Sequence, residues 1–219
     1  MSRPVDRTLE TRLIEAATEW FAASGFAGTR MEEVGRRAGV TKGGVYFRFR
    51  SKEALFFAVV DHWREALRRE VGTVEAGAGG DGAGELEGVL RGWLRFHASH
   101  PGAARILRVL AAELRAGFTA ALRDDAQAEQ RAFRARLREC LHRGGRDGTL
   151  DCGDPALTAF LLAGAAEGCV SQWLSAPAEA LVFRSPDALA EALVAPYRTG
   201  FHRGFSEADD SGAAFTPPF

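Results

Sequence analysis

Residues 38–52 read AGVTKGGVYFRFRSK. Gly39 supplies the backbone freedom that a sharp turn between two helices requires, and Thr41 is a preferred N-cap residue for the helix that follows it. Val45 and Phe49 are four residues apart, so they fall on one face of that helix. The pattern predicts two short helices joined by a tight turn, which is a helix-turn-helix.

The flanking sequence extends this prediction on both sides. Apolar residues recur with a period of 3.6 over residues 8–24, which predicts an amphipathic helix that ends at Gly25. Thr29 and Glu32 have the spacing of a capping box, so the first helix of the motif is expected to begin at Thr29. Ser51 is placed to cap a further helix after the motif. The N-terminal part of the chain is therefore expected to be helical.

Charge and glycine content indicate what the second helix of the motif contacts. Gly43 and Gly44 each destabilise a helix by about 1 kcal/mol relative to alanine, which makes sense if the backbone must approach a surface such as the floor of a DNA groove. Residues 29–52 contain seven Lys or Arg and two Asp or Glu, although the whole chain has a net charge of −1. Such a local basic region favours a polyanionic partner. The alternative is a solvent-exposed helical face rich in arginine.

Composition and motifs argue against several other classes of protein. The 219 residues are 46% hydrophobic, which is enough for a folded core, and three widely spaced cysteines favour a reducing cytoplasm over a disulfide framework. We identify no secretory signal and no uncharged apolar run of about 18 residues, so no membrane span is expected. G-x-S-x-G, P-loop and dinucleotide-binding patterns are missing, so no enzymatic activity is expected.

A second helical part is expected after residue 84. Residues 76–84 contain five glycines in nine, which predicts a flexible linker without helix. Helical segments are expected near 85–99, 103–116, 118–144, 154–175 and 186–203. His97 and His100 are spaced to bind a metal ion, but no third ligand lies at a convincing spacing, so neither a metal nor another cofactor is expected.

Residues 39–56, together with upstream positions such as Phe21, Thr29 and Val34, resemble the signature of TetR-family transcriptional regulators. The resemblance implies an all-α fold of about nine helices. Within it, residues 6–66 would form an N-terminal three-helix DNA-binding domain, with the helix-turn-helix at 30–49. Residues 71–205 would form a larger domain for effector binding and dimerisation.

The resemblance also implies a function. The protein would be a cytoplasmic, ligand-responsive repressor that binds a palindromic double-stranded DNA operator as a homodimer and is released by a small hydrophobic effector. The alternative is a helical small-molecule-binding protein with little or no DNA binding, against which the intact motif argues. The sequence of the second motif helix is nearest to members that include butyrolactone-autoregulator receptors. It departs from them at Arg48, where they usually carry histidine.

The family pattern assigns DNA contacts to eight residues: Thr29, Thr41, Lys42, Gly43, Tyr46, Phe47, Arg48 and Lys52. Thr29 and Tyr46 would donate hydroxyl hydrogens to phosphates, and Lys52 would hold a backbone phosphate. Phe47 would touch a thymine methyl group, and Arg48 would reach either a phosphate or a guanine edge. Packing inside the protein is the alternative for Tyr46 and Phe47, and a solvated helix face is the favoured reading of Arg36 and Arg37.

The C-terminal part offers two further predicted surfaces. An effector pocket would use apolar and aromatic residues with few polar anchors: Trp63, Trp93, Phe96, His97, Leu110, Glu113, Leu114, Phe118, Phe133 and Trp173. A dimer interface of two helices from each subunit would use Phe160, Gly164, Gly168, Leu189, Leu193 and Tyr197. Core packing within one subunit is the alternative for both sets.

Overall fold

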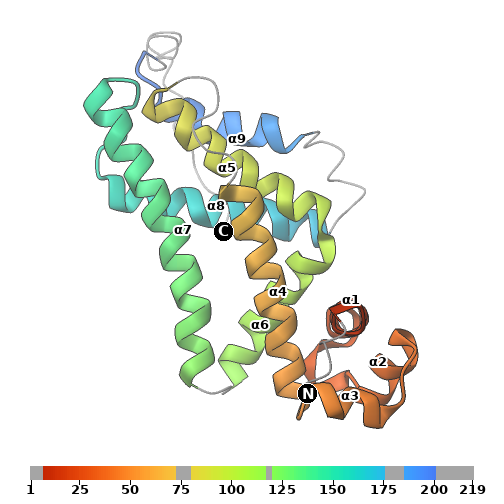
Figure 1. The fold of residues 1–219 in the computed structure, drawn as a ribbon. Helices are drawn as coiled ribbons and strands as arrows, with labels where there is room; N and C mark the ends of the chain where they lie inside the picture. The colour runs from red at the N-terminus through yellow and green to blue at the C-terminus, as the bar shows by residue number, and fades with distance from the viewer. Residues whose placement is uncertain (1–6, 73–79, 117–119, 176–184, 201–219) are drawn as a thin grey trace, which may run out of the picture.

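The computed structural model describes residues 7–72, 80–116, 120–175 and 185–200, and these form nine α-helices (Figure 1). The helices are α1 (Arg7–Gly28), α2 (Met31–Ala38), α3 (Lys42–Arg48), α4 (Lys52–Gly72), α5 (Gly82–Ser99), α6 (Pro101–Ala116), α7 (Ala120–Asp147), α8 (Pro155–Ser175) and α9 (Pro186–Val194). The described residues contain no strand, only an isolated bridge between Leu150 and Arg198. The expected all-α fold is confirmed.

The helix-turn-helix forms where the sequence predicts it. Gly39 adopts a left-handed conformation (φ +74°, ψ +31°), which a residue with a side chain rarely adopts, and so ends α2. The Thr41 hydroxyl oxygen accepts a hydrogen bond from the Gly44 amide at 3.2 Å and caps α3. A Cβ atom on Gly35 would lie 2.9 Å from Val45 Cγ2, so the missing side chain lets α2 and α3 cross closely.

An aromatic cluster holds α1 and α4 together beneath the motif. The ring centroid of Phe21 lies 4.9 Å from that of Phe56 in an edge-on arrangement, and Phe26 lies 5.4 Å from Phe56. All three rings are buried. Gly25 breaks α1 with a φ of +69°, as expected, and the chain turns there so that Phe26 can reach the cluster.

A second core forms around α5, which packs against α7, α8 and α9. Two helices connect the cores, because α4 extends from the α1–α3 group toward α5 (Figure 1) and α6 packs against α1. Leu67 packs against the C-terminal core, whereas Ile106 and Leu110 of α6 are buried in the N-terminal core. The helix α6 therefore contributes to both cores, because its Ala104 belongs to the C-terminal core.

The expected linker without helix at 76–84 is wrong for its last three residues, because α5 already begins at Gly82. Asp81 caps this helix through the Gly84 amide at 2.7 Å, and the Gly82 amide donates to Asp147 Oδ2 at 2.7 Å. A Cβ on Gly82 would lie 2.1 Å from the backbone nitrogen of Gly144. Glycine is thus required by close packing between α5 and α7, which outweighs its low helix propensity.

Two predicted helix boundaries also differ. The last helix was expected over 186–203, but α9 ends at Val194 and a 3-10 turn follows over Ala195–Tyr197. The Tyr197 carbonyl there accepts a hydrogen bond from the Asp151 amide at 2.7 Å, which ties this turn to the α7–α8 loop. Thr29 does not cap α2, whose N-cap residue is Arg30.

Candidate nucleic-acid interface and ligand pocket

The α3 helix presents nearly all of its side chains to solvent. Only Val45 is buried, whereas Tyr46 is 40% exposed and Phe47 is 92% exposed. Gly43 is open: apart from its chain neighbours and the backbone of its own helix, a Cβ built there would meet only the hydroxyl oxygen of Thr41, at 3.8 Å. Phe47 therefore does not pack inside this subunit. The exposed face of α3, opposite Val45, is accessible to a partner.

Two cations of α3 are held by carboxylates from neighbouring helices. Lys42 forms an ion pair with Glu32 of α2, and its ammonium lies 5.9 Å from the centre of the Tyr46 ring. The hydrogen bond from Lys42 lowers the pKa of the Glu32 carboxyl and raises the pKa of Lys42. Arg48 forms an ion pair with Glu10 of α1. These exposed carboxylates would compete with phosphate groups for the same cations.

The structure places Thr29 and Lys52 in internal roles. Thr29 is 2% exposed, and its hydroxyl donates to the Gly25 carbonyl at 2.7 Å, so this hydrogen is not available to a phosphate in this conformation. The Lys52 ammonium donates to the carbonyls of Ala27 and Thr29 at 3.2 and 3.1 Å and lies 4.6 Å from the centre of the Phe26 ring. These two hydrogen bonds therefore connect the start of α4 to the segment between α1 and α2. They leave one N–H group of the Lys52 ammonium for a further acceptor.

Three cations near the motif were not assigned DNA contacts from the sequence. Arg30, Arg36 and Arg50 are exposed and form no ion pair with any described residue. Arg37, in contrast, donates two hydrogen bonds to Glu19 and joins α2 to α1, while its side chain stays on an exposed helix face. The basic charge of residues 29–52 was the signal for these arginines, but only the structure shows which of them are unpaired.

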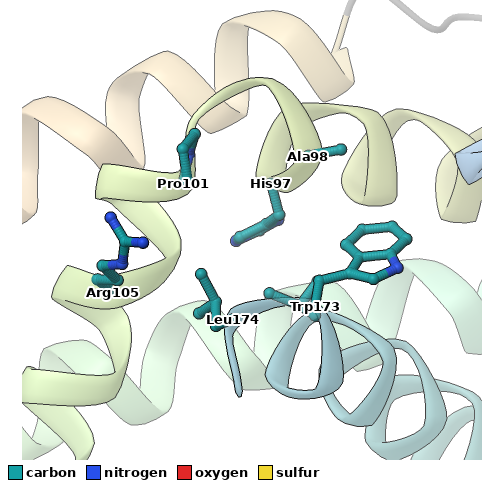
Figure 2. Close-up of a pocket in the computed structure, with 7 residues that line it drawn as sticks. His97, Ala98, Pro101, Arg105, Trp173 and Leu174 are labelled. Carbon is teal, nitrogen blue, oxygen red and sulfur yellow. The ribbon is translucent and has the colours of Figure 1, made fainter. Parts of the chain in front are cut away.

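A pocket of about 290 Å³ lies where the end of α5 and the start of α6 meet the end of α8 (Figure 2). It is lined by His97, Ala98, Pro101, Arg105, Val170, Trp173 and Leu174. Of the ten residues predicted to bind an effector, His97 and Trp173 are among its lining residues. Arg105, on the first turns of α6, was missed because a single exposed arginine has no distinctive sequence pattern.

Five of the other predicted pocket residues do not line this pocket. Phe96 and Leu110 are buried in the protein core, and Trp93 stacks on Phe133 with ring centroids 5.3 Å apart. Trp63 donates a hydrogen bond from its indole nitrogen to Thr18 at 3.0 Å. The side chains of Glu113, Leu114 and Phe118 lie outside the described residues.

His97 is the buried polar residue among those that line the pocket. It is 3% exposed, and its Nδ1 lies 2.8 Å from the carbonyl oxygen of Trp93, one turn earlier in α5. Burial lowers the pKa of the imidazole to about 4, so the ring is neutral at pH 7. Nδ1 of His100 similarly lies 3.0 Å from the carbonyl of Phe96. Among the described residues no group of three His, Cys, Asp or Glu side chains could hold a metal ion.

One face of α8 is apolar and mostly exposed, and the Arg134 guanidinium of α7 lies 5.7 Å from the centre of the Phe160 ring on it. Leu157, Phe160 and Leu161 are each more than half exposed, and a Cβ on Gly164 or Gly168 would meet nothing within 4 Å. Among the described residues, α8 is also the helix whose length and hydropathy would suffice for a membrane span. Its opposite face is nevertheless buried against the protein core.

The predicted interface residues of α9 and the following turn differ from those of α8. Leu189, Leu193 and Tyr197 are half-buried and pack against the core of their own subunit. The helix α9 itself lies against α5. Part of the surface of each of these three residues is therefore used for packing within its own subunit, which was the alternative to a dimer interface.

Two family models match the chain. The model described as "Bacterial regulatory proteins, tetR family" matches residues 13–59, and "Tetracyclin repressor-like, C-terminal domain" matches residues 79–177. Together they cover well over half of the 219 residues. The chain belongs to the TetR family. The resemblance drawn from residues 39–56 is thereby confirmed.

Curated relatives match only in the N-terminal part. The HTH-type transcriptional regulator RutR of Escherichia coli K12 is 40% identical over 60 residues, which are 26% of this chain and 28% of RutR. The uncharacterized HTH-type regulator YerO of Bacillus subtilis is 36% identical over 52 residues, which are 24% of this chain and 18% of YerO. The match thus spans less than a third of the length of these relatives.

Solved structures match over nearly the whole chain at low identity. A TetR-like transcriptional regulator from Rhodococcus sp. RHA1 superimposes with a TM-score of 0.70 and 21% identity, covering 89% of this chain and 96% of that one. SmeT, the repressor of a Stenotrophomonas maltophilia multidrug efflux pump, gives a TM-score of 0.67 and 21% identity, covering 88% and 92%. SmeT is also found in complex with triclosan. At this identity the comparison confirms the fold.

Proposed function

We propose that this TetR-family chain is a ligand-responsive repressor that binds a palindromic operator as a homodimer and is released by a small hydrophobic effector. The observation that carries the DNA-binding part is Phe47, which is 92% exposed on a helix whose other exposed side chains, Lys42, Tyr46 and Arg48, each carry a polar group. Burying a phenylalanine side chain contributes about 1.5–3 kcal/mol, so leaving one in solvent favours a partner that covers it. The alternative function, ligand binding without DNA binding, does not explain why Phe47 is exposed.

The proposed complex uses α3 in the major groove. The N-terminal residues Thr41, Lys42 and Gly43 would face the base edges, as recognition helices of this type do. Phe47 would contact a thymine methyl group, and the hydroxyl of Tyr46 would donate to a phosphate. Lys42 and Arg48 would exchange their carboxylate partners for DNA, and the unpaired Arg30, Arg36 and Arg50 would contact phosphates in place of Thr29.

The exposed apolar face of α8 supplies the proposed dimer contact. Its three exposed apolar side chains and the open positions at Gly164 and Gly168 allow a second copy of α8 to approach closely. One motif per chain then requires two chains for a palindrome, with the recognition helices about 34–36 Å apart. Leu189, Leu193 and Tyr197 would contribute through the parts of their surfaces that their own core leaves free.

The effector would act through α6. Pro101 and Arg105 line the pocket, whereas Ile106 and Leu110 on the same helix are buried in the core beneath the DNA-binding motif. A shift of α6 would therefore move α1, against which it packs. A coupling free energy of about 1–3 kcal/mol is enough to change operator occupancy, and operator DNA must weaken effector binding by the same factor.

We expect the protein to act in the cytoplasm without enzymatic activity. The similarity of the second motif helix to butyrolactone-autoregulator receptors makes butyrolactones a reasonable first set of compounds for an effector screen.

The test begins with the full chain and a pool of randomised duplexes. Repeated selection should recover a palindrome, and fluorescence anisotropy should show two chains on the palindrome, weak binding to a single half-site, and affinity that falls steeply with salt. The matched DNA control is the same duplex with one half-site scrambled. Recovery of no sequence, or full affinity for one half-site, would refute the proposal.

A further inference from the structure

The pocket between α5, α6 and α8 contains one buried polar atom that the described residues leave unsatisfied. Nδ1 of His97 faces the Trp93 carbonyl, which can only accept, so Nδ1 carries the imidazole hydrogen. Nε2 is then a lone-pair acceptor, and it is buried without a hydrogen-bond partner among the described residues. The low pKa of the ring keeps Nε2 unprotonated at pH 7.

The surroundings of Nε2 are mostly apolar. The remaining lining residues apart from Arg105 are Ala98, Pro101, Val170, Trp173 and Leu174. In Figure 2 the His97 ring lies between Arg105 on α6 and Trp173 on α8. An unpaired buried acceptor destabilises its site, and a hydrogen-bond donor brought by a ligand would remove this penalty.

We propose that this pocket binds a small apolar molecule bearing a hydroxyl group, an alcohol or a phenol, whose O–H donates to Nε2 of His97. The inference rests on the proposed effector-responsive function and names the chemical class of the effector. The volume of about 290 Å³ lies at the small end of ligand pockets, so the molecule is small.

The geometry also predicts which molecules the pocket rejects. An ether or a carboxylate offers only acceptor atoms, so it would leave Nε2 unpaired and place two acceptors against each other. Arg105 is exposed at the pocket and forms no ion pair with a described residue, so it would attract a carboxylate by charge alone. Comparing a hydroxyl with a carboxylate therefore separates recognition by His97 from recognition by Arg105.

Three probes of nearly equal size make the comparison: 2-naphthol, 2-methoxynaphthalene and 2-naphthoate. Calorimetric titration of the full-length protein without DNA should show 2-naphthol binding at least about tenfold more tightly than the methyl ether, because the ether leaves a buried acceptor unpaired. The 15N resonance of His97 Nε2 should shift with 2-naphthol and stay unchanged with the ether. The carboxylate should bind no better than the ether.

Two variants locate the effect. His97→Phe keeps a ring but removes the acceptor, so 2-naphthol and its ether should bind equally. Leu174→Trp keeps His97 and fills the pocket, so all three probes should lose affinity. If His97→Phe fails to fold, the loss of binding in Leu174→Trp still tests whether the probes occupy this pocket.

The outcomes are separable from those of the DNA experiment. Equal affinity for 2-naphthol and the ether in the wild-type protein, no binding of 2-naphthol, tighter binding of the carboxylate, or an unchanged preference in His97→Phe would each overturn the assignment. If 2-naphthol shows the expected preference but leaves operator affinity unchanged, the pocket chemistry stands and its regulatory role fails.

Discussion

The helices α3 and α8 both leave large apolar side chains in solvent, but their surroundings differ. Phe47 on α3 lies among charged and hydroxyl-bearing residues, with Lys42 and Arg48 on the same short helix. Phe160 on α8 lies with Leu157 and Leu161 on a helix face that also contains uncovered glycines. An exposed ring among cations suits a nucleic acid, whereas an apolar face with small residues suits another helix. The two exposed surfaces therefore indicate two different partners.

The largest effect on operator affinity is expected from a bulky side chain placed on the exposed apolar face of α8. Gly164→Leu has free space within its own subunit and replaces a poor helix former, so each subunit should fold normally. The added side chain should hold two copies of α8 apart and leave a monomer in sedimentation experiments. Loss of the dimer should weaken operator binding by about 100-fold or more, because the second half-site no longer binds intramolecularly.

Gly145→Leu is the matched control for this variant. Gly145 is also helical, exposed and without neighbours within 4 Å, but it lies on α7. This variant should remain dimeric and bind the operator normally. A stable Gly164→Leu dimer would place the interface on another surface and leave the apolar face of α8 without its proposed partner.

The next largest effect is expected from the buried His97 of α5, which lines the pocket. Its pKa is lowered from 6.5 to about 4 in the folded protein, so the unfolded chain takes up the proton first as the pH falls. The stability that neutral His97 contributes is therefore complete above pH 6.5 and is lost as the pH falls to 4. The full loss is about 3 kcal/mol from the pKa difference.

Chemical denaturation between pH 7 and pH 4 measures this loss. The wild-type protein should lose stability more steeply over this range than His97→Gln, which cannot take up the proton. His142→Gln, at an exposed position on α7, is the control and should follow the wild type. Parallel pH profiles for the wild type and His97→Gln would show that His97 is not held neutral by burial.

A smaller effect is expected from Phe47→Ala on α3. Because Phe47 is almost fully exposed, its removal should leave the melting temperature unchanged. Operator affinity should fall by roughly tenfold, since a good base contact contributes about 1–3 kcal/mol. Phe160→Ala is the reciprocal control, because it should weaken the dimer and leave half-site contacts intact. A Phe47→Ala protein with wild-type affinity would remove the main support for the DNA-binding proposal.

The difference between the two regions also explains what the sequence could predict. The turn at Gly39 and the cap at Thr41 depend on residues within four positions, so the sequence was sufficient to place α2 and α3. The start of α5 depends on Asp147 and on the close approach of Gly144, which are more than 60 residues away. Local composition therefore predicted a linker over residues 82–84, where the structure has the start of α5.

The functional residues divide in the same way. The structure exposes Tyr46 and Phe47, the two residues for which internal packing was the alternative to a DNA contact. The carbonyl partners of Lys52 and the burial of Thr29 result from how α1, α2 and α4 pack together, and periodicity within one helix carries no signal for them. The pocket arises where three helices meet, so His97 and Trp173 are the only ones of the seven predicted residues with described side chains that line it.

The smallest effect concerns the ion pair between Glu10 and Arg48. This carboxylate occupies a cation of α3 and places a negative charge beside the proposed path of the DNA backbone. Glu10→Gln should therefore free Arg48 and tighten operator binding by about two- to fivefold at low salt, with a smaller gain at high salt because exposed charges are screened. Glu65→Gln makes the same charge change on α4, where Glu65 pairs with Arg68, and should leave the affinity unchanged. Anisotropy titrations at two salt concentrations measure both variants. Weaker binding by Glu10→Gln would mean that Glu10 holds Arg48 in position for its DNA contact, which would make this acidic residue part of the DNA-binding surface and not a competitor of the phosphates.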